Sequence, residues 1–274
     1  MFKSTAITNT GLVLGFCVLL GLGACARPRD AAPTPDQAKG ILKLRGYELD
    51  QVDFARAAAA SDEVAVNLFF AAGTNPNTKD GTTSPLIAAA TRGDLEMVKA
   101  LVQGGALVNQ KDEKGFTALL RALQDQDYDV ADVLLAKPEL DVNAQGSTGV
   151  TALMSYVGGQ RENIVKNLLS RGADANLKDA DGDTALHLAS QAGNVNVLRM
   201  LLEKGAELNA RNKMGGTPLM WAAVFGHREA AQILLERGAD ASLEDNKGNT
   251  AAAWAKENKR DEVAELLEAV EKKR

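Results

Sequence analysis

The sequence predicts an all-α repeat solenoid of about seven units, each a pair of short helices. A Thr or Ser that opens a Thr-Ala-Leu, Thr-Pro-Leu or Ser-Pro-Leu triplet recurs at Ser84, Thr117, Thr151, Thr184 and Thr217, and Thr250 takes the same place in a Thr-Ala-Ala triplet. These markers are evenly spaced except for the step from Thr117 to Thr151, which is longer by one because of an extra residue near Pro138 to Asp141. Self-similarity at a period of about 33 residues indicates units that stack to bury a common core.

The unit at residues 183–215 shows why each repeat folds as a helix pair. Two amphipathic helical patterns, residues 184–192 and 196–204, are joined by Gly193 and followed by Gly205 and a polar turn. A Thr at the marker position caps the first helix through its hydroxyl, and Pro218 of a later unit suits the first helical position. The glycine after the second helix is expected to end it in a left-handed conformation.

These residues resemble the ankyrin repeat. The family pattern opens with Thr-Pro-Leu-His-x-Ala, places Gly-His between the helices and closes with Leu-Leu-x-x-Gly-Ala before an Asp-x-x-Gly turn. The corresponding segments here are 217–222 (TPLMWA), Gly226-His227, 234–239 (LLERGA) and 245–248 (DNKG). Six copies match, and a degenerate seventh fits Val52 to Gly81, so that the resemblance covers about four-fifths of the chain.

Both ends of the array are predicted to be capped, as a solenoid in water requires. At the N-terminal end, residues 36–50 contain a short helical pattern that would cover the first repeat. At the C-terminal end, the segment from Lys256 to Glu262 is charged where inner repeats carry Ala, Gly and Val. The ankyrin-repeat domain with both caps is therefore expected to span residues 38–274.

Residues 1–24 are predicted to be a signal peptide. Lys3 is the only charge before Arg27, and only apolar residues and Gly occupy the stretch from Gly11 to Ala24. That length suits a signal-peptide core and is short for a membrane span, which needs about 20 residues.

The end of this stretch, Leu22-Gly23-Ala24-Cys25, resembles the lipobox of bacterial lipoproteins. The resemblance implies cleavage before Cys25 and acylation of that cysteine, with Ala26 favouring the outer membrane. The alternative is an ordinary secretory signal with a chance cysteine. Residues 25–37, rich in Pro, would then form a tether of about 3.1 Å per residue, and the domain would face the periplasm of a bacterial cell envelope.

Composition excludes several classes of function. Without Lys3, 30 basic residues face 36 acidic ones, a formal charge of −6. We expect no nucleic-acid binding, and membrane contact through the lipid anchor alone. The chain is expected to be a monomer without cofactors. With Cys17 removed and Cys25 acylated, it keeps no thiol for a disulfide.

No catalytic constellation is apparent, and an enzyme is not expected. His187 and His227 lie in two different repeats and occupy positions where the ankyrin pattern itself favours His. Their expected role is hydrogen bonding within and between repeats, and no metal site is predicted. Acidic residues of the turns, among them Asp112, Asp179 and Asp245, are expected to accept backbone hydrogen bonds.

The candidate site residues are those that depart from the repeat pattern. By the resemblance, partners dock on the concave face, at positions 4, 3 and 1 before the marker Thr and 7 and 8 after it. In the repeat of Thr217 these positions hold Lys213, Met214, Gly216, Val224 and Phe225, of which three are apolar. Val224 and Phe225, with Met214 nearby, are predicted to form an exposed apolar patch for protein contact, and Lys213 is counted with them as partner-binding. The alternative is that Phe225 folds onto the adjacent helix pair as core.

Tyr156 is the second departure, since it occupies the position of Ala189 and Ala222. Its ring would either push repeats apart or direct its hydroxyl toward a groove, with Gly158 and Gly159 allowing the distortion. Simple sequence drift is the alternative.

The function predicted from these features is binding of one specific protein, whose identity is unknown, either to support an exported enzyme or to neutralise a toxin. A structural envelope lipoprotein without a single tight partner is the competing hypothesis. It predicts a generally polar concave face. A small-ligand site would instead need a closed pocket with converging polar groups.

Overall fold

The computed structural model contains seven successive helix pairs in the residues that it describes, one pair for each sequence repeat. It describes residues 32–77, 83–159 and 162–271, and these contain helices and loops but no strand. The pairs are α2 (Gln51–Ala59) with α3 (Glu63–Ala71), α4 (Pro85–Thr91) with α5 (Leu95–Gln103), α6 (Ala118–Gln124) with α7 (Tyr128–Leu135), α8 (Ala152–Tyr156) with α9 (Glu162–Ser170), α10 (Ala185–Ala192) with α11 (Val195–Glu203), α12 (Pro218–Phe225) with α13 (Arg228–Glu236), and α14 (Ala251–Glu257) with α15 (Asp261–Glu271). The predicted all-α fold and its repeat number are confirmed.

Each first helix from α4 onward begins directly after the predicted marker residue. The six N-caps are Ser84, Thr117, Thr151, Thr184, Thr217 and Thr250. In Thr151, for example, the side chain accepts a hydrogen bond from the backbone N–H of Met154 at 3.2 Å. This bond satisfies one of the amide groups that a helix start leaves without an internal partner.

A glycine with positive φ follows the second helix of most pairs. Gly105, Gly172, Gly205 and Gly238 have φ values of +87°, +85°, +82° and +93°. A Cβ at these positions would meet no atom within 4 Å, so the backbone conformation and not crowding requires glycine. After α7 the sequence reads Ala136-Lys137-Pro138 instead, which is where the repeat carries its extra residue.

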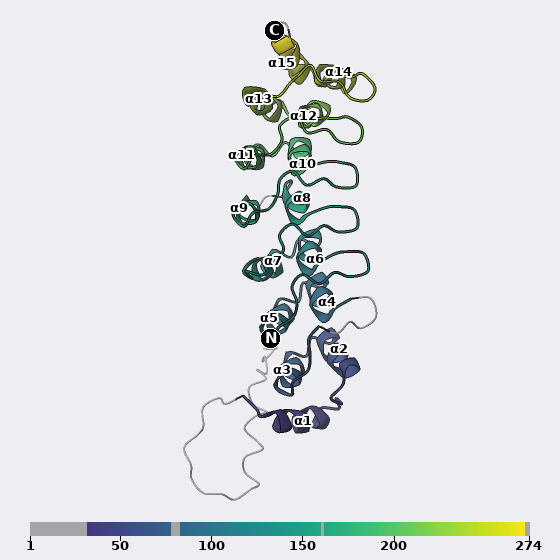
Figure 1. The fold of residues 1–274 in the computed structure, drawn as a ribbon, viewed down its shortest axis with the longest axis vertical. Helices are drawn as coiled ribbons and strands as arrows, with labels where there is room; N and C mark the ends of the chain where they lie inside the picture. Colours follow the sequence, from purple (N-terminus) through teal and green to yellow (C-terminus); the bar gives the residue numbers. More distant parts are fainter. Residues whose placement is uncertain (1–31, 78–82, 160–161, 272–274) are drawn as a thin grey trace, which may run out of the picture. The chain divides into compact units, whose positions relative to one another are not determined.

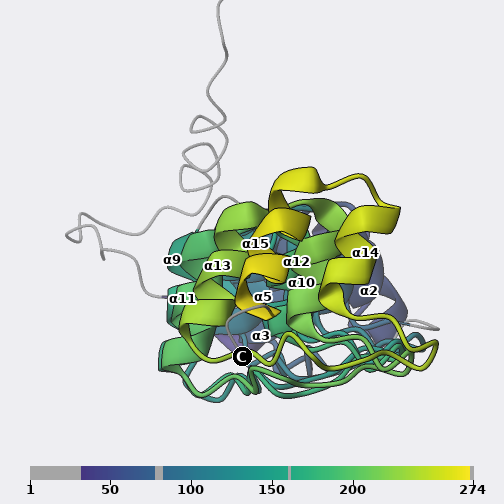
Figure 2. The same ribbon diagram turned by 90° about the horizontal axis from the view of Figure 1, so that it is seen from above.

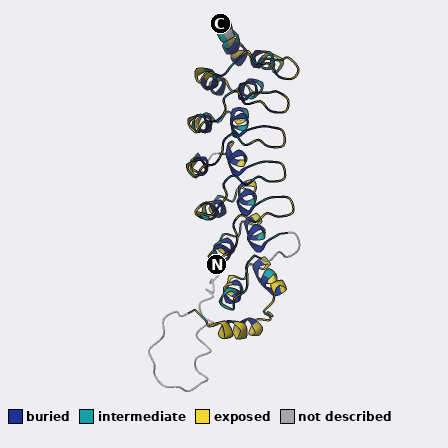
Figure 3. Cartoon of the chain, in the orientation of Figure 1, coloured by how far each residue is buried: buried dark blue, intermediate teal, exposed yellow. Residues whose placement is uncertain are grey.

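The helices form two layers, and the loops project to one side (Figures 1 and 2). One layer contains the first helices of the pairs and the other contains the second helices. The sides of the helices that face one another are buried (Figure 3). Leu186, Ala189, Leu198 and Leu201, from the fifth pair, are all fully buried. Small Ala residues in the first layer let successive helices approach closely.

A ladder of asparagine side chains ties each repeat to the next. The side-chain amide of Asn176 donates to the carbonyl of Gly205 at 3.1 Å, and its oxygen accepts from the N–H of Glu207 at 2.8 Å. Asn77, Asn109 and Asn143 bridge the preceding repeats in the same way. The ladder satisfies carbonyl groups left open at the helix ends.

The turns between repeats are organised by acidic side chains, as predicted. One carboxylate oxygen of Asp112 accepts backbone N–H groups of Lys114 and Phe116, both at 2.9 Å. Asp179 and Asp245 accept equivalent pairs of amides. Backbone hydrogen bonds also join successive loop tips. We call the surface formed by these tips and the first helices the inner face.

The two histidines serve the structure, as expected. The Thr184 N–H donates to Nδ1 of His187 at 3.2 Å, so that Nε2 carries the proton and donates to the Gly216 carbonyl of the next repeat at 3.1 Å. Nε2 of His227 lies 2.9 Å from the carbonyl of Gln191 in the preceding repeat. No group of three or more His, Cys, Asp or Glu side chains in the described ranges is arranged to hold a metal ion.

A helix and a charged segment stand at the two ends where caps are predicted. Helix α1 (Pro35–Leu44) buries Ala38 and Leu42 against the first pair. It begins within the segment expected to be tether, because Thr34 and Gln37 form a capping box there; residues 35–37 are therefore helical. At the other end the charged residues around Lys256 to Glu262 are exposed. The predicted signal peptide at 1–24, Cys25 and the tether up to residue 31 lie outside the described residues.

We expect His187 to make stability depend on pH on the acidic side of neutrality. Burial lowers the pKa of His187, although the Gly216 carbonyl and Asp183 act in the opposite direction. The unfolded chain, with an ordinary pKa of about 6.5, then takes up the proton first. The contribution of neutral His187 to the free energy of unfolding is therefore complete above about pH 6.5 and is lost as the pH falls below that value.

Thermal unfolding of the wild type and of His187→Gln, followed by circular dichroism from neutral to mildly acidic pH, tests the expectation. The wild type should lose more stability toward acidic pH than the variant, which has no imidazole at this position. Equal losses in both proteins would contradict it.

Candidate protein-contact site

Three hollows of the inner face lie between successive repeats, and equivalent repeat positions contribute to their walls. They occur between the second and third pairs, the third and fourth, and the sixth and seventh, with volumes of about 470, 990 and 340 Å³. Their walls include the residue just before a marker and residues three or four positions after it, such as Phe116, Leu120, Gly216 and Met220. The inner face is therefore indented where the family resemblance predicts partner contact.

The hollow between the second and third pairs is lined in part by charged side chains. Arg121 forms an ion pair with Asp112 at 2.5 Å, and its guanidinium lies 4.3 Å from the centre of the Phe116 ring. Burial acts to raise the pKa of Asp112, but hydrogen bonds from Arg121 and from backbone amides outweigh it and the pKa is lowered. The charges of Arg121 and Asp112 thus already have partners within the chain.

The hollow between the sixth and seventh pairs, which we call the Trp cleft, is mainly apolar. Its lining residues are Asn212, Lys213, Met214, Gly216, Met220, Trp221, Val224, Asp245, Asn246, Lys247 and Trp254. Trp221 and Trp254 occupy equivalent positions of α12 and α14, one repeat apart, and both are partly exposed. Met214 at the loop tip is 61% exposed. Three of the predicted site residues, Lys213, Met214 and Val224, thus line one cleft.

Hydrogen bonds hold the walls of the Trp cleft in place. The indole N–H of Trp221 donates to Asp183 at 3.1 Å, and the side-chain amide of Asn212 donates to the same carboxylate oxygen at 2.8 Å. The Asn212 oxygen accepts the N–H groups of Met214 and Gly216 at 3.0 and 2.8 Å. One network therefore fixes both the indole and the loop tip, so that little ordering entropy remains to be lost on binding.

The second tryptophan is fixed in a similar way. The indole N–H of Trp254 donates to Asp245 at 3.0 Å. Burial acts to raise the pKa of Asp245, but hydrogen bonds from Asn249, Lys247 and Trp254 lower it below its usual value. The carboxylate thus stays charged and is directed at donors of its own repeat.

Phe225 lies beside the Trp cleft and not among its lining residues. Its ring stacks on His227 with a centroid distance of 6.4 Å and an interplanar angle of 8°, and lies 5.9 Å from the Trp221 ring. It is 38% exposed. The sequence left open whether Phe225 is part of an exposed patch or of the core. The residue combines both, because one side of the ring packs within its own repeat and the rest is open to solvent.

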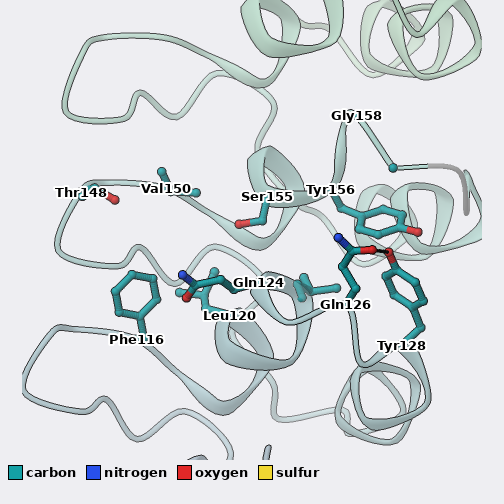
Figure 4. Close-up of a pocket in the computed structure, with 12 residues that line it drawn as sticks. Phe116, Leu120, Gln124, Gln126, Tyr128, Thr148, Val150, Ser155, Tyr156 and Gly158 are labelled. Atoms are coloured by element: carbon teal, nitrogen blue, oxygen red, sulfur yellow. Dashed lines mark hydrogen bonds between the residues drawn. The ribbon is translucent and has the colours of Figure 1, made fainter. Parts of the chain in front are cut away.

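Tyr156 lies in the wall of the largest hollow, which we call the Tyr groove. The groove is lined by Phe116, Leu120, Leu123, Gln124, Gln126, Tyr128, Thr148, Val150, Ser155, Tyr156, Gly158 and Gly159. Figure 4 shows Phe116 at one end, near the loops, and the rings of Tyr128 and Tyr156 at the other. These two rings meet edge to face, with centroids 5.3 Å apart.

The structure places Tyr156 in the core and not on the surface. It is 2% exposed, so it offers a partner almost no contact area. Gly159 lies directly over the ring, and a Cβ there would come within 2.6 Å of the ring atom Cζ. Helix α8 has five residues, against seven in α6 and eight in α10. The first helix of this repeat is therefore short where Gly159 approaches the buried ring of Tyr156.

Sequence reasoning missed Trp221, Trp254 and Lys247. The signal was available, since the two tryptophans stand four positions after consecutive markers, where other repeats carry Ala88, Arg121, Ser155 or Leu188. The docking positions that the sequence analysis took from the first helix of this repeat were those of Val224 and Phe225, near the end of the helix. The position of Trp221 was not among them.

The predicted lipidation site, Cys25, lies outside the described residues. Among the helices of the described ranges, none is both long and apolar enough to cross a membrane.

Comparison with known proteins agrees with the geometry. A model of the family described as "Ankyrin repeats (3 copies)" matches residues 54–146, 138–212 and 207–273. The "Putative ankyrin repeat-containing protein" of Treponema pallidum (strain Nichols) is 34% identical over 139 residues, which are 50% of this chain and 46% of that protein. The match thus spans about half the length of this curated relative. Ankyrin repeats generally serve as protein–protein interaction modules and are typically non-enzymatic scaffolds.

Single substitutions should separate surface from core among the predicted site residues. Phe225→Ala is expected to lower the free energy of unfolding by about 1–2 kcal/mol, because the side chain is only partly buried. Tyr156→Ala is expected to cost about 3 kcal/mol or more, since it empties a buried site. Urea unfolding measures both. A loss for Phe225→Ala as large as that for Tyr156→Ala would show that Phe225 is core.

Proposed function

The chain belongs to the ankyrin-repeat family, and we propose that it is a membrane-anchored periplasmic module that binds one specific protein through its inner face. The observation that carries the proposal is the Trp cleft, where an apolar hollow with fixed walls lies at the positions that the family uses for docking. Protein contacts draw much of their free energy from a few buried aromatic and apolar anchors, and tryptophan is prominent among them.

The exposed apolar surface supports this proposal. Met214 and Phe225 are 61% and 38% exposed beside the partly exposed tryptophans. A purely structural envelope lipoprotein, the competing hypothesis, would show a generally polar inner face. The Trp cleft therefore favours a specific partner.

Anchoring is proposed from the lipobox-like sequence at Leu22 to Cys25. The lipid on Cys25 would hold the protein to the outer membrane, with the repeats facing the periplasm. Support of an exported enzyme and neutralisation of a toxin both remain compatible with such a module, because the scaffold accepts either surface. The formal charge of −6 after removal of Lys3 favours a protein over nucleic acid as partner.

The anchor is tested by changing Cys25 to Ser. Without an acylated cysteine, the protein is expected to move from the membrane fraction to the soluble periplasmic fraction. Fractionation and immunoblotting measure the shift. Retention of the variant in the membrane, to the same extent as the wild type, would contradict the lipobox interpretation.

The binding function is tested by affinity capture from envelope extract with the mature domain as bait. Met214→Asp replaces an apolar side chain of the Trp cleft by a carboxylate and should remove the captured partner, because the apolar contact is lost and burial of a charged group is costly. Leu107→Asp is the matched control, since Leu107 is 57% exposed but lines none of the three hollows.

One stoichiometric partner, captured by the wild type and by Leu107→Asp but lost with Met214→Asp, is the expected result. Capture of the same proteins by all three baits, or of none, would count against a specific partner at the inner face and favour the structural role.

A further inference from the structure

We propose that the Trp cleft receives an aromatic or long aliphatic side chain from an acidic segment of the partner protein. This inference rests on the proposed protein-binding function and adds the chemistry of the bound segment. Two independent features of the described residues carry it, namely the apolar lining of the cleft and the positive charges beside it.

The cleft has the size and the surface for an apolar side chain. Its volume of about 340 Å³ lies at the low end of small-molecule sites, about 300–1,000 Å³. It thus suits a side chain rather than a folded element. Met214, Met220 and Val224 line it together with the two indoles. Thioether and indole surfaces favour aromatic partners, and methionine adapts its shape to what enters.

The charge around the cleft is positive, although the chain as a whole is acidic. Lys213 and Lys247 come from consecutive loop tips and both are exposed. Neither takes part in the six ion pairs found among the described residues. Asp245, the acidic residue of the lining, is buried and accepts hydrogen bonds from Trp254 and from two backbone amides.

Other acidic groups of these loops lie apart from the lining. Asp181 and Glu244 are exposed in the same set of loops but do not line the cleft. The charges presented at its mouth are therefore the two ammonium groups. Carboxylates of a partner on either side of an inserted apolar residue would complement them and would guide its approach.

Recognition is expected to proceed through side chains and not by addition of a strand. The N–H of Asn246 donates to the carbonyl of Met214 at 2.9 Å, and its side-chain amide donates to the Lys213 carbonyl at 2.8 Å. The N–H of Lys213 donates to the Asp181 carbonyl at 2.9 Å. These backbone groups are already paired, so a partner gains its free energy from the apolar insertion and from the lysines.

The chain carries its own reporters for this site. It contains two tryptophans, Trp221 and Trp254, and both line the cleft. In a ¹H–¹⁵N spectrum their two indole resonances will report directly on occupancy. The probe is a synthetic peptide with the core Asp-Glu-Phe-Asp-Glu, compared with one in which Ala replaces Phe and one in which Lys replaces all four acids.

The acidic Phe peptide is expected to shift both indole resonances in a saturable manner. Replacing Phe by Ala should weaken binding about tenfold or more, because the apolar insertion is lost. Replacing the acids by Lys should weaken it by a similar factor, and added salt should weaken the acidic peptide as well. Equal shifts with all three peptides, or no shift with the acidic Phe peptide, would overturn the proposal.

A charge-reversed protein provides the second arm. Lys213→Glu with Lys247→Glu should bind the acidic Phe peptide about tenfold more weakly. Lys166→Glu with Lys204→Glu is the matched control, because it makes the same change in charge at exposed residues of the second-helix layer. Far-UV circular dichroism verifies that both variants are folded. Equal weakening in both would indicate a general charge effect and refute a role for the two cleft lysines.

Failure here is distinguishable from failure of the proposed function. If Met214→Asp abolishes partner capture while the peptide leaves the indoles unchanged and the Lys213→Glu/Lys247→Glu protein still captures the partner, the inner face binds protein but not by this chemistry. If light scattering shows instead that the protein dimerises and that Met214→Asp breaks the dimer, the occupant is a second copy and the proposal is wrong.

Discussion

No helix pair of this chain can bury its apolar side without a neighbour, and the rest of the structure follows from that constraint. Leu186 and Leu198 become fully buried only because adjacent pairs lie against the fifth one. The asparagine ladder and the bond from His187 to Gly216 add polar links across the same boundaries. Stability is then a sum of nearest-neighbour terms, and both ends need polar caps.

The same constraint leaves the inner face free to vary. The core and the ladder are satisfied between neighbouring repeats, so the stack places fewer demands on a residue that faces the hollows. Two tryptophans can therefore stand where other repeats carry Ala88, Arg121, Ser155 and Leu188. The two large departures also differ in their surroundings: Trp221 lines the Trp cleft and is partly exposed, whereas Tyr156 is buried against Tyr128.

The sequence was sufficient for the parts that depend on local chemistry. The six capping residues, the acidic turns and the glycines after the second helices are each specified within a few positions of the chain, and the structure confirms them. The candidate site was harder to predict, because the positions of its side chains depend on residues outside their own helices. Trp221 is fixed by Asp183 of the preceding repeat, and the burial of Tyr156 follows from where α8 ends and Gly159 folds over the ring. The position of a residue within the repeat predicts the face of the solenoid on which it lies, but not how far its side chain is exposed.

The central claim, that the inner face is the protein-contact surface, is tested most directly by site-specific photo-crosslinking in living cells. A photoreactive amino acid would replace Met214 on the inner face or Gln232, an exposed residue of α13 in the second-helix layer. The account predicts one discrete adduct from position 214 and none from position 232. An adduct from position 232 alone, or from neither position, would contradict it.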